Sequence, residues 1–221
     1  MKGYKVFNPD WTCRGFQYEP GKTFKYDGEI KLCKSGFHFC EKFEDCFRYY
    51  VLDIKNHVCE VETDGLVETD DGKSVTNKLT IGRELSWEEV CERLSKDEKI
   101  AVRWKVADNP NTPVNILEKL STDEDLWVRR AVASNPNTPI DILEKLSTDE
   151  EWRVRCGVTE NPNTPIDILE KLSEDKREYV RRAVAANLNT PIDILKKLSE
   201  DEWWTVRCAV ATNPNTAAVV I

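Results

Sequence analysis

The chain has 221 residues, of which 32 are Lys or Arg and 40 are Asp or Glu, so its formal net charge at pH 7 is −8. This acidic balance argues against a protein that binds the phosphate backbone of nucleic acid, since such proteins present basic surfaces. No apolar run is long enough to span a bilayer and the first residues contain no signal-peptide core, so we expect a cytoplasmic protein that does not enter a membrane.

The first 82 residues predict a small α+β domain. Five short segments rich in aromatic and β-branched residues are separated by Gly, Pro and Asp, a pattern typical of strands. These segments are 4–7, 23–26, 37–40, 58–61 and 78–81. Apolar residues recur at helical spacing from Phe43 to Tyr50, which predicts one amphipathic helix over 42–52.

Cysteine and histidine residues gather in the middle of this domain. The cluster consists of Cys33, His38, Cys40, Cys46, His57 and Cys59. No Cys-x-x-Cys pair occurs in it, and both His-x-Cys pairs lie in predicted strands. We therefore expect buried free thiols and no metal, with a metal site at this cluster as the alternative.

Three stretches of the N-terminal domain, 3–7, 13–16 and 36–40, resemble an N-terminal domain of unassigned function found in bacterial and phage proteins. This resemblance covers about residues 1–85 and implies no chemistry.

The strand that begins at Gly36 and leads into the predicted helix is also similar to compact ADP-ribosyltransferase domains. That similarity implies that Arg14 holds a nicotinamide dinucleotide and that Glu60 or Glu84 polarises the ribose. The simpler interpretation of His38 is a histidine of the core or its rim. An open cleft lined by Arg14, His38 and Glu60 would favour an enzyme, and a filled sheet would exclude it.

From residue 83 onward the sequence repeats every 26 residues. An Asn recurs at this interval and opens nearly identical segments: Asn109, Asn135, Asn161, Asn187 and Asn213. The repeats are a degenerate copy at 83–108, complete copies at 109–134, 135–160, 161–186 and 187–212, and a stub at 213–221. This period indicates a solenoid, because each unit exposes an apolar face that only its neighbours cover. The chain therefore divides into domains 1–82 and 83–221.

Each repeat carries signals for two short helices. Thr138, followed by Pro, predicts an N-cap and a first helical position, and Asp141 predicts a carboxylate at the third helical position. A second helix begins near Asp123 and buries Val128 and Val132. The other repeats show the same pattern.

The stretches 128–133 and 135–139 resemble the leucine-rich repeat variant family, and the resemblance covers about residues 83–221. It implies a right-handed superhelix of alternating α- and 3₁₀-helices that serves as a scaffold rather than an enzyme. Leu188 and Ala217 depart from the pattern by replacing Pro.

Four positions after the repeated Asp change in every copy and are rich in aromatic residues. Because solenoids place recognition residues where the framework constrains them least, we expect partner contacts there. The candidate partner-binding residues are Trp127, Trp152, Arg153, Tyr179, Trp203 and Trp204. The alternative is that some of these rings pack on the preceding repeat.

Two charged sets do not vary between repeats. They are Arg103, Arg129, Arg155, Arg181 and Arg207, with Asp97, Asp123, Asp149, Asp175 and Asp201. We expect each Arg to pair with an Asp or a helix-end carbonyl of its own or the next repeat. The alternative is a basic column that binds an acidic tail or phosphates. The repeated Asn residues are expected to form a ladder of stacked turns.

These features predict a scaffold for a protein or peptide partner, with the N-terminal domain capping the repeats or adding specificity. The alternative is that the N-terminal domain is a nucleotide-dependent, ADP-ribosyltransferase-like enzyme or a ligand-binding unit that the repeats deliver. The sequence shows no acid and base at diagnostic spacing, no phosphate loop and no metal knuckle. We therefore predict no cofactor, and we favour a protein that is not an enzyme while leaving that question open.

Overall fold

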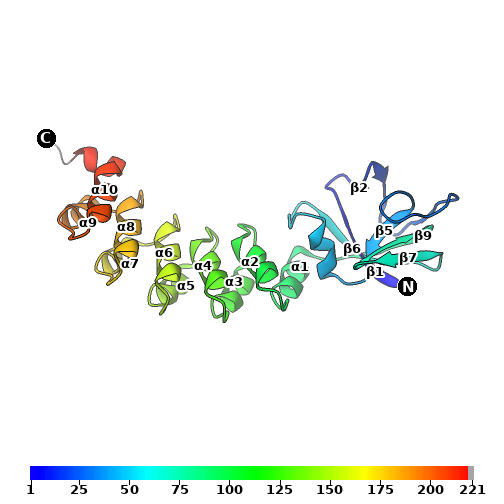
Figure 1. The fold of residues 1–221 in the computed structure, drawn as a ribbon, viewed down its shortest axis with the longest axis horizontal. Helices are drawn as coiled ribbons and strands as arrows, with labels where there is room; N and C mark the ends of the chain where they lie inside the picture. The colour runs from blue at the N-terminus through cyan, green and yellow to red at the C-terminus, as the bar shows by residue number, and fades with distance from the viewer. Residues whose placement is uncertain (219–221) are drawn as a thin grey trace. The chain divides into compact units, whose positions relative to one another are not determined.

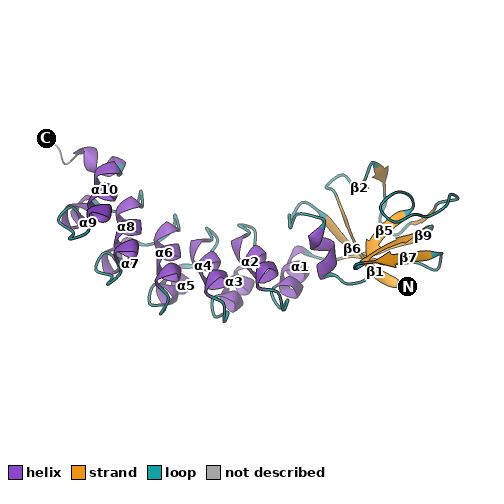
Figure 2. Cartoon of the chain, viewed as in Figure 1, coloured by secondary structure: helices purple, strands orange, loops and turns teal. Residues whose placement is uncertain are grey.

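A computed structural model describes residues 1–218, and the last part of the predicted stub, 219–221, lies outside the described residues. The chain forms two compact units, Met1–Asp97 and Glu98–Ile221. The first unit is built mainly of strands and the second of helices (Figures 1 and 2).

The strands of the first unit form an antiparallel sheet of seven strands in the order β4-β9-β6-β1-β5-β8-β7. Their bounds are β1 Lys2–Phe7, β4 Thr23–Lys25, β5 Phe37–Cys40, β6 His57–Glu62, β7 Val67–Asp70, β8 Lys73–Thr76 and β9 Lys78–Glu84. A separate pair is formed by β2 (Thr12–Cys13) and β3 (Phe16–Gln17). The sheet predicted from the sequence is thus confirmed.

The two neighbours of β1 in the sheet pair with it to different extents. β6 pairs along the whole of β1, whereas the register of β5 with β1 in the described chain is the single pair Tyr4↔Cys40. Gly3 permits this close approach, since a Cβ there would lie 2.4 Å from the main-chain oxygen of Cys40. In the described chain the register of β1 with β5 has no pair beyond Tyr4, and the Lys5 side chain there donates to the His38 carbonyl of β5.

The helix predicted over 42–52 is shorter and of a different type. The structure has a 3₁₀-helix, η1, at Glu44–Arg48. The apolar spacing was correct, since Phe43, Cys46 and Phe47 are buried. At its end the Cys46 carbonyl accepts hydrogen bonds from the amides of both Tyr49 and Tyr50, and so short a segment gains little from α-helical propagation.

The last helix of the first unit is α1 (Trp87–Leu94). It begins with a capping box, in which the Ser86 hydroxyl accepts from the Glu89 amide and the Glu89 carboxylate accepts from the Ser86 amide.

The second unit is a run of alternating longer and shorter helices (Figure 1). The nine-residue helices are α2 Ile100–Asp108, α4 Leu126–Ser134, α6 Trp152–Glu160, α8 Glu178–Ala186 and α10 Trp204–Thr212. The seven-residue helices are α3 Val114–Leu120, α5 Ile140–Leu146, α7 Ile166–Leu172 and α9 Ile192–Leu198, and a 3₁₀-helix, η2, follows at Pro214–Ala218. The predicted all-α solenoid of repeats is confirmed. The 3₁₀ layer is not, because both helices of each repeat are α-helical.

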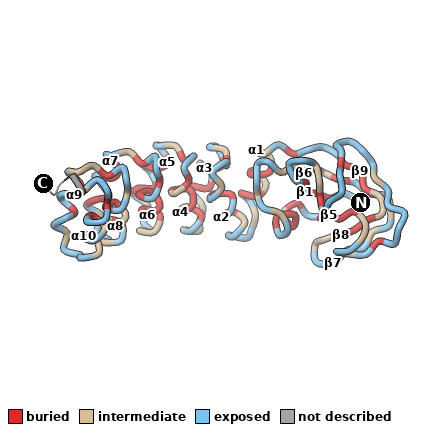
Figure 3. Tube along the Cα trace, turned by 90° about the horizontal axis from the view of Figure 1, so that it is seen from above, coloured by how far each residue is buried: buried red, intermediate tan, exposed pale blue. Residues whose placement is uncertain are grey.

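The buried residues of the repeats gather where the two rows of helices meet (Figure 3). In one repeat these are Val128 and Val132 of α4 together with Ile142, Leu143 and Leu146 of α5. Each helix therefore buries one apolar stripe and leaves the opposite side free.

The threonine before each Pro does not cap the helix that follows it. Thr138 donates its hydroxyl to the Val132 carbonyl at 2.6 Å, which closes the preceding helix. The N-cap of α5 is Pro139, with no side-chain cap, and Asp141 is the second residue of the helix rather than the third. The prediction of a Thr cap was wrong, because the buried Thr138 hydroxyl instead donates its hydrogen bond to the Val132 carbonyl of the preceding helix.

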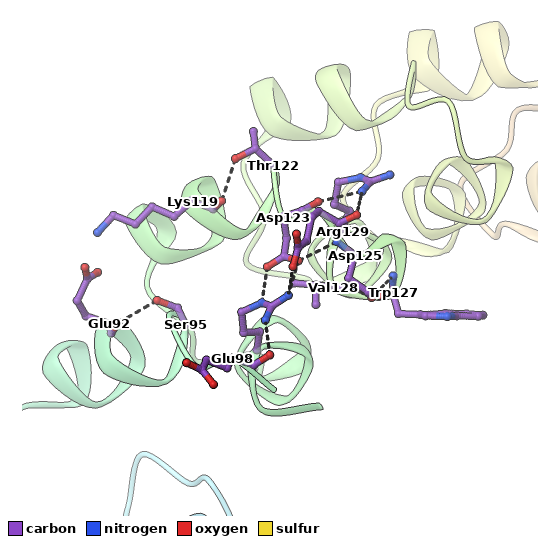
Figure 4. A network of polar contacts seen from close by, with 12 residues as sticks. Glu92, Ser95, Glu98, Lys119, Thr122, Asp123, Asp125, Trp127, Val128 and Arg129 are labelled. Carbon is purple, nitrogen blue, oxygen red and sulfur yellow. Dashed lines mark hydrogen bonds and ion pairs between the residues drawn. The ribbon is translucent and has the colours of Figure 1, made fainter. Parts of the chain in front are cut away.

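Arginine and aspartate side chains join each repeat to the next. Arg129 donates two hydrogen bonds to Asp149, from Nε at 2.8 Å and from Nη2 at 3.1 Å. It also donates to the Asp123 carbonyl of its own repeat, as Figure 4 shows. The same pairs recur as Arg103–Asp123, Arg155–Asp175 and Arg181–Asp201. The prediction that the repeated Arg and Asp residues pair within the framework is confirmed. Their side chains are engaged in these ion pairs.

The repeated asparagines make a second ladder. Asn161 donates to the Asn135 carbonyl of the preceding repeat at 2.6 Å, and to the Ala133 carbonyl near the end of the repeat before that at 2.9 Å. Its own side-chain oxygen accepts from the Asn163 amide. Because every polar atom of this buried side chain has a partner, the turn ladder predicted from the sequence is confirmed.

Candidate partner-binding groove and N-terminal cleft

Four of the predicted partner-binding side chains lie together on successive repeats. Trp127 stands on α4, Trp152 and Arg153 open α6, and Tyr179 stands on α8. The ring centroids of Trp152 and Tyr179 are 4.9 Å apart with an interplanar angle of 24°. The Arg153 guanidinium lies 4.5 Å from the Trp152 ring and 5.7 Å from the Trp127 ring. They form a continuous row of stacked rings and guanidinium.

This row forms one side of an open groove across α4, α6 and α8, which we call the aromatic groove. Its cavity volume is about 770 Å³. Besides the four residues above, its lining includes Arg130, Cys156, Glu160, Arg182, Asn187 and Leu188. Such a size is within the range of ligand-binding clefts.

The charges of the aromatic groove are mainly positive. Arg130 donates to both oxygens of Glu160, at 3.1 and 2.8 Å, so this pair is neutral. Arg153 faces aromatic rings, and no carboxylate pairs with Arg153 or Arg182 within residues 1–218. Two guanidinium groups are therefore available to a ligand, on a chain that is acidic as a whole.

Two further predicted residues lie elsewhere. Trp203 is the N-cap of α10 and Trp204 is its first residue, and neither lines the aromatic groove. Both rings are exposed. The alternative interpretation, that rings pack on a neighbouring repeat, holds in part, since Tyr179 stacks on the half-buried Trp152 of the repeat before it.

Sequence reasoning missed part of the groove lining. Leu188 replaces a repeated Pro and is 67% exposed, so this departure from the repeat was the available signal. Arg130, Cys156 and Arg182 occupy one repeat position, one helical turn after the aromatic position. That spacing places them on the same face of the helix.

The four residues implied by the enzyme alternative are not brought together. Arg14 and His38 line a cleft in the first unit. Glu60 pairs with Arg83 at 3.1 Å, and Glu84 lies 2.7 Å from the His57 ring. Neither glutamate lines the cleft. The sheet is open at this point, but it lacks the glutamate that the similarity implied.

His38 is held neutral in this cleft. Its Nε2 accepts a hydrogen bond from the Cys33 amide at 2.8 Å. Burial, followed by the charges of Arg14, Lys5 and Lys73, lowers the pKa of His38 to about 4. His38 therefore supplies no charge at neutral pH, mainly because it is buried and in addition because cations surround it.

The residues that the structure describes include no candidate metal cluster and no candidate membrane-spanning helix. Within residues 1–218, no group of three or more His, Cys, Asp or Glu side chains is arranged to hold a metal ion. No helix in the same residues has the length and apolar character needed to cross a bilayer.

Comparisons with known proteins find family matches for two separate parts of the chain. Residues 1–93 match a family described as Domain of unknown function (DUF7666), and residues 126–151 match the family Leucine rich repeat variant. Among solved structures, a match is "A leucine-rich repeat variant with a novel repetitive protein structural motif", with 32% sequence identity and a TM-score of 0.48. It covers 58% of this chain and 52% of that chain, so the present chain spans about half its length. Among curated proteins no match is found. The resemblance to the leucine-rich repeat variant family is thus confirmed at 126–151, and the N-terminal region matches a family whose function is unassigned.

Proposed function

We propose that this protein is a cytoplasmic scaffold that holds a protein or peptide partner in the aromatic groove. The observation that carries the proposal is the row of stacked side chains across α4, α6 and α8, with an open groove beside it. Aromatic and arginine side chains provide most of the binding energy in protein interfaces. The Arg–Asp and Asn ladders are occupied by contacts within the repeats, which supports placing the partner in the aromatic groove instead.

The chemistry of the groove favours an acidic segment that carries an apolar side chain. Arg153 and Arg182 offer guanidinium groups without a carboxylate partner among residues 1–218, and Leu188 offers apolar surface. A carboxylate of the partner would complete these pairs, since guanidinium and carboxylate groups match in geometry. Complementary charge also raises the rate of association.

The test is a selection of displayed random peptides on the intact protein, followed by binding measurements on variants. We expect the selected peptides to be rich in Asp and Glu and to contain an aromatic or aliphatic residue. Tyr179→Ala should cost about 2 kcal/mol of binding free energy, or about 30-fold in Kd. Arg182→Glu should weaken acidic peptides by a similar factor, because it places like charges together.

Two matched controls use residues outside the groove. Trp104→Ala removes a ring that is 40% exposed on α2, and Arg177→Glu reverses a charge next to α8. Both should bind like the wild type, and circular dichroism should show intact helices in all variants. Peptides that bind Tyr179→Ala and Arg182→Glu as well as the wild type would reject this surface. If the groove bound a single-stranded oligonucleotide in preference to the peptides, the partner would be a nucleic acid and not a protein or peptide.

A further inference from the structure

Lys5 carries a buried amino group with no carboxylate partner among the described residues, and burial lowers its pKa. It is 3% exposed and extends from β1 at the point where β1 and β5 cease to pair. Its ammonium donates to the His38 carbonyl at 2.6 Å and lies 3.4 Å from the Cys13 sulfur. The rings of Phe7 and Tyr18 lie within 5.5 Å of it. Burying an ammonium in such surroundings is costly unless an anion accompanies it.

The cleft at Lys5 consists of two hollows of about 320 and 340 Å³, both lined by Lys5, Arg14 and His38. Lys73 is added in the first hollow, and Lys25 and Lys34 in the second. In the described part of the chain, neither hollow is lined by Asp or Glu. The nearby Asp45 pairs with Arg48 instead. A cationic cleft on an acidic chain attracts anions.

Aromatic rings line the second hollow. Phe16 and Tyr26 are 43% and 38% exposed, although large apolar rings are usually covered. The buried Tyr18 and Phe37 lie behind them. This side of the cleft therefore offers an aromatic surface, next to the cations, on which the flat ring of a ligand could stack.

The backbone around the cleft is strained. Arg14 and Cys33 have φ angles of 54° and 63°, in the left-handed region that favours glycine. The two strained residues are joined, since Arg14 donates to the Cys33 carbonyl at 3.3 Å. The Cys33 amide in turn donates to His38. Strain of this kind is typical of ligand-binding sites.

We propose that this cleft binds a small phosphorylated molecule with an aromatic ring, such as a nucleoside monophosphate, with the phosphate between Lys5 and Arg14. A phosphate group carries between one and two negative charges, which suits several cations better than a single carboxylate would. The ring lies against Phe16 and Tyr26. The site is independent of the aromatic groove, and the test below is independent of the peptide selection.

His38 reports on this site directly, because the chain contains only two histidines. The full-length protein is labelled in its histidines, and both imidazoles are titrated by NMR with AMP, inorganic phosphate, adenosine or no addition. A bound phosphate offsets the charges of Lys5 and Arg14, so AMP should raise the pKa of His38 by about one pH unit. Inorganic phosphate should cause a smaller rise and adenosine none. His57, which stacks on Trp11 and lies outside the cleft, is the internal reference.

Variants of residues inside and outside the cleft test whether AMP binds in the cleft or elsewhere on the protein. Arg14→Gln and Lys5→Met should weaken AMP binding at least tenfold by calorimetry, whereas Lys55→Met, an exposed lysine outside the cleft, should not. Without ligand, Lys5→Met should melt no lower than the wild type, because it removes an uncompensated buried charge. If Lys5→Met fails to fold, the exposed Arg14→Gln still decides the outcome. Absence of AMP binding at millimolar concentration, or equal binding by Arg14→Gln, would overturn the proposal, as would equal shifts of His38 and His57.

Discussion

Arg155 and Asp175 show how a single pair of residues joins two repeats. Both side chains are less than 10% exposed, and two hydrogen bonds connect them at 2.6 and 3.0 Å. Arg155 also donates to the Asp149 carbonyl at 2.7 Å. Although burial raises the pKa of Asp175, the hydrogen bonds from Arg155 and the Arg177 amide outweigh it and lower the pKa below 3.8. A buried pair of this kind is costly to break on one side only.

Asp175→Asn should therefore lower the free energy of unfolding at pH 7 by about 2–4 kcal/mol. Since the folded pKa is depressed, the stabilising effect of Asp175 is fully present above 3.8, and it is lost as the pH falls through the folded pKa. Urea unfolding followed by circular dichroism, repeated from pH 7 to pH 3, measures both effects.

The matched control for this prediction is Asp193→Asn on α9. Its side chain is 90% exposed and lies 3.9 Å from Lys196, so it should change stability by less than about 1 kcal/mol. Equal losses in the two variants, or a loss at Asp175 that does not shrink in acid, would show that the buried pair is not the cause.

At the scale of elements, Gly157 sets how closely α6 approaches α4. A Cβ at this position would lie 2.8 Å from the Arg130 carbonyl and 3.0 Å from the Ala133 Cβ. The equivalent residues of the neighbouring repeats, Ala131 and Ala183, do carry a Cβ. The glycine therefore allows a locally closer packing of α6 on α4, and α6 is the helix that carries Trp152 and Arg153.

Gly157→Ala should destabilise the protein by about 1–3 kcal/mol through overpacking. Helix propensity alone predicts the opposite effect, a gain of about 1 kcal/mol in the free energy of unfolding. The Ala at the equivalent position of the other repeats also suggests that Ala is tolerated there. Thermal unfolding decides between the two. Ala183→Gly, the reverse change on α8, should cost about 1 kcal/mol by propensity alone. A higher melting temperature for Gly157→Ala would refute the close packing.

The elements differ in how far the sequence predicts them. The five predicted strands and the repeat helices follow from local periodicity, and the structure confirms them; β2, β3, β7 and β8 were not predicted. The segment 42–52 had the right apolar spacing, yet it forms only a short 3₁₀-helix at Glu44–Arg48. Thr138 looked like a cap because its neighbours in the sequence suit one, but a carbonyl six residues earlier captures its hydroxyl. In the case of Thr138, a buried hydrogen bond of the folded chain decided the outcome.

At the scale of the whole molecule, the repeats combine an invariant framework with a surface that varies. The sequence predicted this division, because Arg, Asp and Asn recur while aromatic residues shift position. It did not predict which aromatic residues come together. Trp203 and Trp204 satisfy the same sequence criterion as Tyr179 but lie outside the aromatic groove, whose lining depends on Leu188 and Arg182 from later turns of the chain.

The N-terminal cleft was predicted in part. The sequence singled out Arg14 and His38, and both line it. Lys5 gave no signal, because in the sequence it is an ordinary lysine of an alternating strand. Its importance arises from the incomplete pairing of β1 with β5, a property of the sheet as a whole.

If the partner is held in the aromatic groove and not along the whole stripe of variable residues, positions 179 and 203 should differ in their contact with it. The most direct measurement places a photo-crosslinking amino acid at position 179 or at position 203 of the full-length protein in its native cells. We predict that crosslinked partner forms at position 179 and not at position 203, although both native side chains are about equally exposed, at 48% and 47%. Crosslinks of equal yield at both positions, or at position 203 alone, would contradict the account.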